Sequence, residues 1–330
     1  MVILTDSGGN EIGPVKFKKI DIDLGDTRDF ELTISNAKWD SRLKSKNRIF
    51  VPRTEFGGII GGKKIDTSQD SVIVKGRTWR GVLEKKVIKP PSGEAYKIVS
   101  GEVNTVIRGL ISEAKLTGIF AVSDNNTGIS VTSYQFDRYT TLLAGIEKLL
   151  KSVGYKLCIE YIQMERGLPG YVLLSAKQIK DYSNLVELSQ DNKLNFILEE
   201  TENGVNHLVC LGKGELTERE VIHLYIDKDG NVGTTQYYTG IDEVEETYDY
   251  SSAESEELLE KGTETLLELT NSKSLKMDIE KLSAEVDIGD VISGRDYTTG
   301  TSLSKPVVNK IYTEENGIRK LEYKLEGDEN

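Results

Sequence analysis

The feature that most constrains the fold of this sequence is a series of short runs in which apolar and polar residues alternate. In the run 29–35, Phe30, Leu32 and Ile34 alternate with polar residues, and this period of two is typical of a half-buried β-strand. Further short strand-like runs, separated by turn residues, lie at 16–23, 48–52, 59–64 and 71–74. Because many short strands with frequent turns are typical of small barrels and sandwiches, we predict an antiparallel β-barrel domain over residues 1–95.

Helical patterns begin at Thr78, a residue type that caps helix N-termini. The short helix expected there carries Trp79, Val82 and Leu83 on one face, which should anchor it against the first barrel. Pro90-Pro91 is expected to end it. Two longer helices with an apolar face are expected at 103–114 and 142–153. Strand-like runs lie around them at 119–122, 129–136, 155–162 and 170–174. We therefore predict a mixed α/β domain over residues 96–187.

Strand signals return after residue 187. The runs lie at 194–199, 207–211, 221–226, 275–279, 291–292, 307–312 and 319–325. The pairs Asp229-Gly230 and Asn316-Gly317 are strong signals for tight hairpin turns. We predict a second β-barrel domain built from 188–239 and 271–330, interrupted by an acidic helical insertion over 240–270. The expected fold class is therefore α+β and β-rich, with two small antiparallel β-barrel modules, a mixed α/β module and this insertion.

Charge is distributed unevenly along the 330 residues, whose net charge is −12. The segment 240–270 holds eleven acidic residues and one basic residue, a net charge of −10, whereas residues 1–97 carry +6. A helix in the acidic segment is expected to begin at Ser251 or Ser252 and to end at Leu269. The negative net charge of the whole chain argues against sequence-independent nucleic-acid binding, because such binding depends on neutralising phosphates with basic residues. The asymmetry indicates that the chain presents distinct surfaces.

No spacing of residues in the sequence predicts a catalytic, cofactor-binding or metal site. The histidines, His207 and His223, and the cysteines, Cys158 and Cys210, lack the spacing of zinc ligands. His207 and Cys210 lie three apart on one expected strand, so their side chains should point to opposite faces. Two cysteines exclude a disulfide framework and favour a reducing cytosol. Neither a secretory signal nor an apolar run long enough to span a membrane is visible.

Three stretches of sequence carry a family resemblance. They are 74–91, 208–219, and 240–262 followed by 286–291. Their motif residues are Gly76, Arg77, Trp79, Leu83, Pro90, Pro91, Gly212, Gly214, Glu215, Arg219, Gly240, Asp242, Gly262, Asp287, Gly289 and Asp290. In this order they resemble the tail-hub, or baseplate-hub, proteins of phages and prophages of Gram-positive hosts, some described as siphovirus tail proteins or prophage endopeptidase tails. Family members often carry Arg where this chain has Lys85-Lys86, which keeps the charge but not the bidentate hydrogen bonding.

The resemblance implies a structural virion component rather than an enzyme. Hubs of this family are homotrimers in which two tube-like barrels per chain imitate two tube subunits, so that three chains join the sixfold tail tube to a threefold spike or tip. The implied partners are the tail tube protein, the spike or tip protein, other baseplate proteins and the tape measure protein. From the residues themselves we expect no cofactor, no direct sequence-specific nucleic-acid binding and no membrane span. The resemblance also implies assembly in the bacterial cytoplasm into a virion tail or a phage-tail-like bacteriocin (tailocin).

The main alternative is a tail-associated peptidoglycan endopeptidase. Longer relatives carry a C-terminal wall-degrading domain, and the sequence ends at Asn330 without room for one, so we expect no enzymatic domain. Pairs of carboxylates able to hydrolyse a substrate stay open, because 54 acidic residues allow many pairings. A cytosolic carbohydrate-binding β protein is a third alternative, although aromatic residues make up only 7% of the sequence. In a trimeric hub we expect the acidic insertion at the periphery, facing a basic partner.

Overall fold

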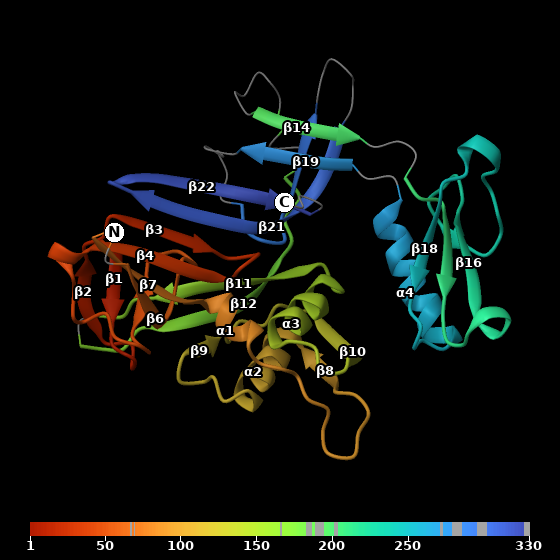
Figure 1. Ribbon diagram of the computed structural model, residues 1–330. Coiled ribbons are helices and arrows are strands. Elements are labelled where there is room, and N and C mark those ends of the chain that lie inside the picture. Colours follow the sequence, from red (N-terminus) through yellow and green to blue (C-terminus); the bar gives the residue numbers. More distant parts are fainter. Residues whose placement is uncertain are drawn as a thin grey trace. The chain divides into compact units, whose positions relative to one another are not determined.

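The computed structural model describes residues 1–66, 68, 70–165, 167–182, 187–188, 195–200, 204–270, 273–278, 286–295 and 302–326. The chain is divided into two compact units, unit 1 with Met1–Phe196 and Met277–Glu326, and unit 2 with Ile197–Lys276. Each unit has a hydrophobic core of its own. Strands predominate over helices among the described elements, which confirms the β-rich prediction (Figure 1). None of the described helices combines the length and apolar character that crossing a membrane requires.

A large sheet dominates unit 1. Its 11 strands follow the order β13-β20-β21-β3-β4-β7-β6-β5-β1-β2, and β22 pairs with β21. The strands are β1 (Val2–Thr5), β2 (Glu11–Val15), β3 (Lys19–Asp23), β4 (Asp29–Ser35), β5 (Arg48–Phe50), β6 (Gly57–Asp66), β7 (Ser71–Thr78), β13 (Glu187–Leu188), β20 (Val291–Arg295), β21 (Ser302–Glu315) and β22 (Ile318–Leu325). β21 pairs antiparallel with β3, so that Tyr312 lies opposite Ile22. Strands from both ends of the chain therefore belong to one sheet, and the blue β21 lies beside the red-orange β3 in Figure 1.

The alternating pattern of the sequence determines which face of this sheet is buried. In β4, Phe30, Leu32 and Ile34 are buried, while the residues between them are partly exposed. They form one core with Ile20 of β3 and Tyr312 of β21. The strand predicted over 29–35 is therefore confirmed, and its apolar face lies in the core of the sheet.

The second core of unit 1 lies among helices and smaller sheets. These elements are α1 (Trp79–Glu84), α2 (Val103–Glu113), α3 (Leu142–Lys151), β8 (Ile98–Glu102), β9 (Phe120–Val122), β10 (Ser130–Gln135), β11 (Tyr155–Ile162) and β12 (Tyr171–Gln178). β11, β12 and β9 form a three-stranded sheet, and β10 pairs with β8. Thr78 caps α1 by accepting a hydrogen bond from the backbone nitrogen of Gly81, and Thr141 caps α3 in the same way through Ala144. The three helices predicted in this part of the chain are confirmed.

Unit 2 is a small sheet with a helix on one face. β15 (His207–Leu211), β16 (Val221–Ile226), β17 (Val232–Gly233) and β18 (Glu245–Asp249) form a four-stranded sheet in the order β17-β16-β15-β18. Leu208 and Cys210 of β15 pack with Leu258 and Leu266 of α4 (Ser255–Leu269). Short 3-10 helices are η1 (Asn36–Lys38) in unit 1, and η3 (Leu216–Glu218) and η4 (Gly240–Asp242) in unit 2. β14 (Asn195–Glu200) and β19 (Lys273–Asp278) form a separate two-stranded sheet.

The strand pairing groups the chain differently from the predicted domain boundaries. The C-terminal strands β20, β21 and β22 join the sheet that contains β1–β7, not the sheet of unit 2. β18 and α4, from the predicted insertion 240–270, are integral parts of unit 2. The described strands form no closed barrel, so the predicted barrel modules are not confirmed. The physical reason is that alternation indicates which face of a strand is buried, but not which strand it pairs with.

Candidate functional site

Arg80 lies at the start of α1, within the first motif stretch. The hydroxyl of Thr78, the last residue of β7, accepts the backbone hydrogen bond of Gly81, so the strand leads directly into the helix. This connection places Arg80 in the interior of unit 1, where only 3% of its side chain is exposed. A buried guanidinium requires partners for its charge and for its N–H donors.

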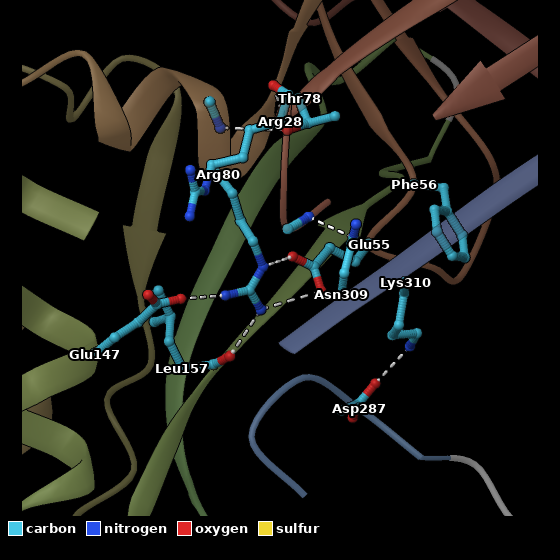
Figure 2. Close-up of polar contacts among 12 residues, drawn as sticks. Arg28, Glu55, Phe56, Thr78, Arg80, Glu147, Leu157, Asp287, Asn309 and Lys310 are labelled. Atoms are coloured by element: carbon cyan, nitrogen blue, oxygen red, sulfur yellow. Dashed lines mark hydrogen bonds and ion pairs between the residues drawn. The ribbon is translucent and has the colours of Figure 1, made fainter. Parts of the chain in front are cut away.

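Figure 2 shows that two carboxylates and a backbone carbonyl surround Arg80. Its Nε atom lies 2.5 Å from Oε1 of Glu55, in the turn between β5 and β6, and its Nη1 atom lies 2.7 Å from Oε1 of Glu147 on α3. Its Nη2 atom donates to the backbone oxygen of Leu157 on β11 at 3.2 Å. Burial disfavours the charged form, but Glu55 and Glu147 outweigh burial, so the pKa of Arg80 is raised. This side chain therefore links the large sheet, α1, α3 and β11.

A second group of charges surrounds Lys156 of β11. The Nζ atom of Lys156 lies 2.6 Å from Oδ2 of Asp290 and 3.5 Å from Oδ2 of Asp287, both in the third motif stretch. Lys310 of β21 donates to the other oxygen of Asp287 at 2.9 Å, a contact drawn in Figure 2. Gly289 has a φ of +95°, and a Cβ atom there would lie 2.9 Å from the Cβ atom of Lys156. The loop can cross Lys156 this closely only with glycine at this position.

The two groups of charges influence each other. Burial disfavours the charged form of Lys310, but Asp287 and Glu55 outweigh burial and raise its pKa. Burial disfavours the charged form of Asp287 as well, but Lys310 and Lys156 outweigh it and lower the pKa of Asp287. At Glu147 burial is stronger than the effect of Arg80, so its pKa is raised. We call this set the buried charge row, in the order Glu147, Arg80, Glu55, Lys310, Asp287, Lys156 and Asp290. Five of the seven side chains are buried, while Glu147 and Asp287 are 38% and 41% exposed.

A cavity of about 380 Å³ adjoins the buried charge row. Arg80, Glu147 and Lys156 contribute to its wall. The apolar part of the wall is formed by Leu24, Leu157, Ile179, Ile288, Val291, Pro306, Val307 and Val308. These residues come from both the N-terminal and the C-terminal parts of unit 1, so the cavity and the charge row mark the place where those parts meet β11.

The motif residues of α1 and its surroundings are packed in the core of unit 1. Trp79 and Leu83 are fully buried, and the Trp79 ring stacks on Tyr161 of β11 with 5.7 Å between ring centroids. Gly76 lies so close to the Phe30 ring and the backbone of Ile59 that any side chain would collide with them. The expected close backbone approach is therefore present at Gly76.

The remaining motif residues of unit 1 are more exposed. Arg77 points away from the core on β7, where it lies opposite Asp29 of β4 in the strand register. Pro90 is partly exposed and Pro91 is exposed, after the end of α1. The helix already ends at Glu84, six residues before Pro90, so the prediction that the two prolines end it is wrong. They do not contribute to the buried charge row.

The other motif residues lie in unit 2, where Arg219 holds the loop after β15. Its Nε atom donates to the backbone oxygen of Gly212 at 3.1 Å, and its Nη2 atom donates to Oδ1 of Asp249 at 2.5 Å. Gly214 and Glu215 lie within this loop, and Glu215 directly precedes η3. The second and third motif stretches therefore meet at Arg219.

The motif residues of the acidic segment lie on both sides of β18. Gly240 and Asp242 form η4, and the backbone oxygen of Asp242 accepts a hydrogen bond from the side chain of Asn206 at 2.7 Å. Gly262 lies on α4, where a Cβ atom would be 2.5 Å from the Sγ atom of Cys210. Most of the motif residues therefore lie in one of the two units as part of its packed interior or its loops, whereas Arg77, Pro90 and Pro91 lie at the surface of unit 1.

Asp287, Gly289 and Asp290 belong to a motif stretch of the sequence, but no sequence signal indicates their basic partners Lys156 and Lys310. Arg80 is missed as well, although this residue lies inside a motif stretch. The sequence does hold a signal for Arg80. It is a basic residue next to Trp79 at the start of a short buried helix, where a charged side chain needs partners. Its acidic partners are distant in sequence, so no spacing rule could have found them.

The chemistry of the buried charge row is structural. Each of its carboxylates has a basic partner within ion-pair distance. Burial raises the pKa of the Cys158 and Cys210 thiols, so neither is an activated nucleophile. As predicted, His207 and Cys210 point to opposite faces of β15, since Cys210 packs against α4 and His207 contacts His223.

No protein-family model matches the sequence, and no curated protein matches it significantly. Solved structures do match. The tail protein from Neisseria meningitidis MC58 is 15% identical with a TM-score of 0.52, and the match covers 99% of this chain and 96% of that chain. The 43 kDa tail protein of prophage MuSo2 from Shewanella oneidensis is 13% identical with a TM-score of 0.53, covering 98% and 97%. A chain of the phage P2 baseplate in its activated conformation with Ca is 11% identical with a TM-score of 0.51, covering 100% and 99%.

Because each match covers nearly the whole chain, it includes both units and not only a single sheet. This chain therefore has the fold of phage tail and baseplate proteins. The resemblance identified from the three sequence stretches is confirmed at the level of the fold.

Proposed function

We propose that this protein is a structural hub in the baseplate or tail tip of a phage, a prophage or a phage-tail-like bacteriocin. The observation that carries this proposal is the correspondence in fold over 99% of this chain and 96% of a known tail protein chain. In this proposal the protein is assembled in the bacterial cytoplasm and becomes part of the tail particle.

The buried charge row supports a scaffold role. The ion pairs of Arg80 connect α1 with α3, and Asp287 pairs with both Lys156 of β11 and Lys310 of the C-terminal strand β21. A wrong arrangement of these elements would leave buried charges unpaired, which is strongly unfavourable. The row therefore favours one arrangement of unit 1. A scaffold protein needs such a fixed arrangement, because it must present the same surfaces to several neighbouring proteins.

We also propose that the hub is a homotrimer that joins a sixfold tail tube to a threefold spike or tip. Its partners would be the tube protein, the spike or tip protein, other baseplate proteins and the tape measure protein. β2 ends the order of the large sheet and contains Pro14, which is typical of an edge strand. A neighbouring copy in a ring is one way to cover such an edge.

Deletion and complementation in cells that produce the particle test the tail role. Without the protein, electron microscopy should show no complete tails, and a plasmid copy should restore them. A tagged copy should bind gold-labelled antibody at one end of each particle. Normal tails in the deletion strain, or label spread along the tube, would contradict a hub.

Native mass spectrometry tests the homotrimer separately. The protein should have the mass of three chains, either alone or after mixing with purified tube and spike proteins. A chain that stays monomeric in both cases would contradict trimerisation, while the deletion experiment would still decide the tail role.

We propose that the role is non-enzymatic, because the carboxylates of the buried charge row are all paired. Incubation of the purified protein with host cell walls should release no muropeptides. Release that disappears when one carboxylate or one cysteine is replaced would instead assign the endopeptidase activity.

A further inference from the structure

The face of the unit 2 sheet opposite α4 carries both histidines of the sequence. The Nε2 atom of His207 on β15 is 2.8 Å from the Nδ1 atom of His223 on β16. The Nδ1 atom of His207 is 2.9 Å from Oε1 of Glu243 and 2.9 Å from Oε1 of Glu245. One ligand atom from each of His207, Glu243 and Glu245 can be chosen so that all lie within 4.8 Å of one another. We propose that these three residues form a binding site for a divalent transition-metal ion of the zinc class.

The first reason is the position of the two carboxylates. The Nδ1 atom of His207 carries at most one hydrogen, yet both Glu243 and Glu245 lie within hydrogen-bond distance of it. Two negatively charged carboxylates therefore lie together at one nitrogen atom that can donate only one hydrogen. A divalent cation in place of that hydrogen binds the nitrogen and both carboxylates and compensates both negative charges.

The ligand types select the class of metal. Imidazole nitrogen combined with carboxylate oxygens suits Zn²⁺, whereas Ca²⁺ and Mg²⁺ prefer oxygen ligands alone. Three protein ligands leave a fourth position for water. The side chain of Glu245 is 61% exposed, so an ion can reach the site from solvent.

Neighbouring side chains hold the ligands in position. His207 is only 5% exposed, and its ring stacks on Tyr225 with 4.2 Å between ring centroids. When Nδ1 binds a metal, the hydrogen of the neutral ring lies on Nε2, where His223 provides an acceptor. The side chain of Gln236 donates to Oε1 of Glu243 at 2.6 Å. The metal ligands therefore have the supporting hydrogen bonds that metal sites usually have.

The backbone around Glu243 is fixed as well. The side chain of Asn206 donates to the backbone oxygen of Asp242 at 2.7 Å and accepts from the backbone nitrogen of Val244 at 3.0 Å. β18 runs parallel to β15, with Glu245 opposite His207. A bound ion would link β15 to β18 and to the loop before it, and would stabilise the acidic part of unit 2. Because His207 lies more than 30 residues before the two glutamates, short-motif searches do not find this site.

Isothermal titration of the metal-free full chain with ZnCl₂ tests the site. The wild type should bind one zinc ion per chain at this site. Glu243→Gln and Glu245→Gln should each weaken binding more than about tenfold, and His223→Ala should weaken it about 10–100-fold, the usual effect of removing an outer partner. The matched control is Glu246→Gln, which removes the same charge from the next residue of β18, on the other face of the strand. This control should bind zinc like the wild type.

Melting temperature gives a second readout. Zinc should raise it in the wild type and in Glu246→Gln, but not in Glu245→Gln, whose exposed position leaves the fold intact. If Glu246→Gln weakens zinc binding as much as the two ligand variants, the ion is held by the general negative charge of the segment and the proposal is wrong. It is also wrong if the folded wild type does not bind zinc, or if an equal concentration of Ca²⁺ displaces the zinc.

Discussion

At the scale of single residues, the charges buried in unit 1 stabilise the fold only as complete pairs. Arg80 and Glu55 are both almost fully buried, with 3% and 7% of their side chains exposed. Taking such charges out of water is unfavourable, and their attraction to each other offsets this cost. Loss of one partner leaves the other charge buried and unpaired. Removing one partner should therefore lower the free energy of unfolding strongly, whereas replacing both partners should change it much less.

We expect Glu55→Gln to lower the free energy of unfolding by about 3–5 kcal/mol, because Arg80 loses its most buried carboxylate. The matched control is Glu31→Gln, which removes a carboxylate from the exposed ion pair with Lys75. Exposed pairs contribute about 0–1 kcal/mol, so this variant should remain close to the wild type. Urea unfolding of both variants measures the difference, and equal stability of the two would contradict the structural role of Arg80.

Glu102, directly before α2, combines helix capping with a strongly lowered pKa. Its carboxylate accepts hydrogen bonds from the backbone nitrogen of Thr105 and from the backbone nitrogen and hydroxyl of Thr127. Burial alone would raise the pKa, but these hydrogen bonds lower it from 4.5 to about 2. A folded-state pKa below the unfolded value means that the ionised group stabilises the fold at neutral pH. This stabilisation is lost as the pH falls from about 4.5 through about 2.

We therefore expect Glu102→Gln to lower the free energy of unfolding at neutral pH by about 1 kcal/mol, the usual effect of losing a helix cap. The difference from the wild type should become smaller as the pH is lowered from about 4.5 towards about 2. Urea unfolding at a series of pH values measures this trend. A difference that stays constant with pH would show that the charge of Glu102 does not contribute.

At the scale of elements, local pattern predicted several strands that bury their own apolar residues, although it missed the fully buried β1. β11, β15 and β16 have the bounds predicted from the runs 155–162, 207–211 and 221–226. β18 was missed, because most of its residues are exposed and acidic, and it is a strand through parallel pairing with β15. The same limit applies to the candidate sites. The sequence indicates Asp287 and Asp290. The roles of Lys156 and Arg80 cannot be predicted from it, because their ion-pair partners lie in distant segments of the chain.

The contact of α4 with β15 depends on the absence of a side chain at Gly262. A Cβ atom there would lie 2.5 Å from Sγ of Cys210 and 2.9 Å from Cδ1 of Leu224. We expect Gly262→Val to destabilise unit 2 by about 1–3 kcal/mol, because added carbon atoms overpack a filled core. The control Glu268→Val places the same side chain at an exposed position of α4 and should lose about 0.5 kcal/mol or less. Urea unfolding compares them, and similar losses would mean that helix propensity, not packing, is responsible.

At the scale of the whole molecule, the two units differ in how their chain segments are assembled. The described part of unit 2 comes from one continuous stretch of chain, which begins within β14 and ends within β19. Unit 1 needs both ends of the sequence, because β21 completes its sheet beside β3 and because Lys310 and Asp287 belong to the buried charge row. Contacts between distant segments form slowly in folding. The sheet of unit 1 is therefore complete only after the C-terminal strands have been made.

We expect the two units to unfold in separate transitions, since each has its own core. Hydrogen exchange measured by mass spectrometry at increasing urea concentrations can assign each transition to its peptides. In Gly262→Val, peptides from 205–270 should lose protection at a lower urea concentration, while peptides from 1–182 and 302–326 should behave like the wild type. In Glu55→Gln, peptides of unit 1 should lose protection at a lower urea concentration, while peptides from 205–270 should behave like the wild type. The N-terminal and C-terminal peptides of unit 1 should lose protection together, because they share one sheet. If either variant shifts all peptides equally, the chain unfolds as one cooperative body. If Glu55→Gln affects only N-terminal peptides, the pairing of β21 with β3 does not couple the two ends.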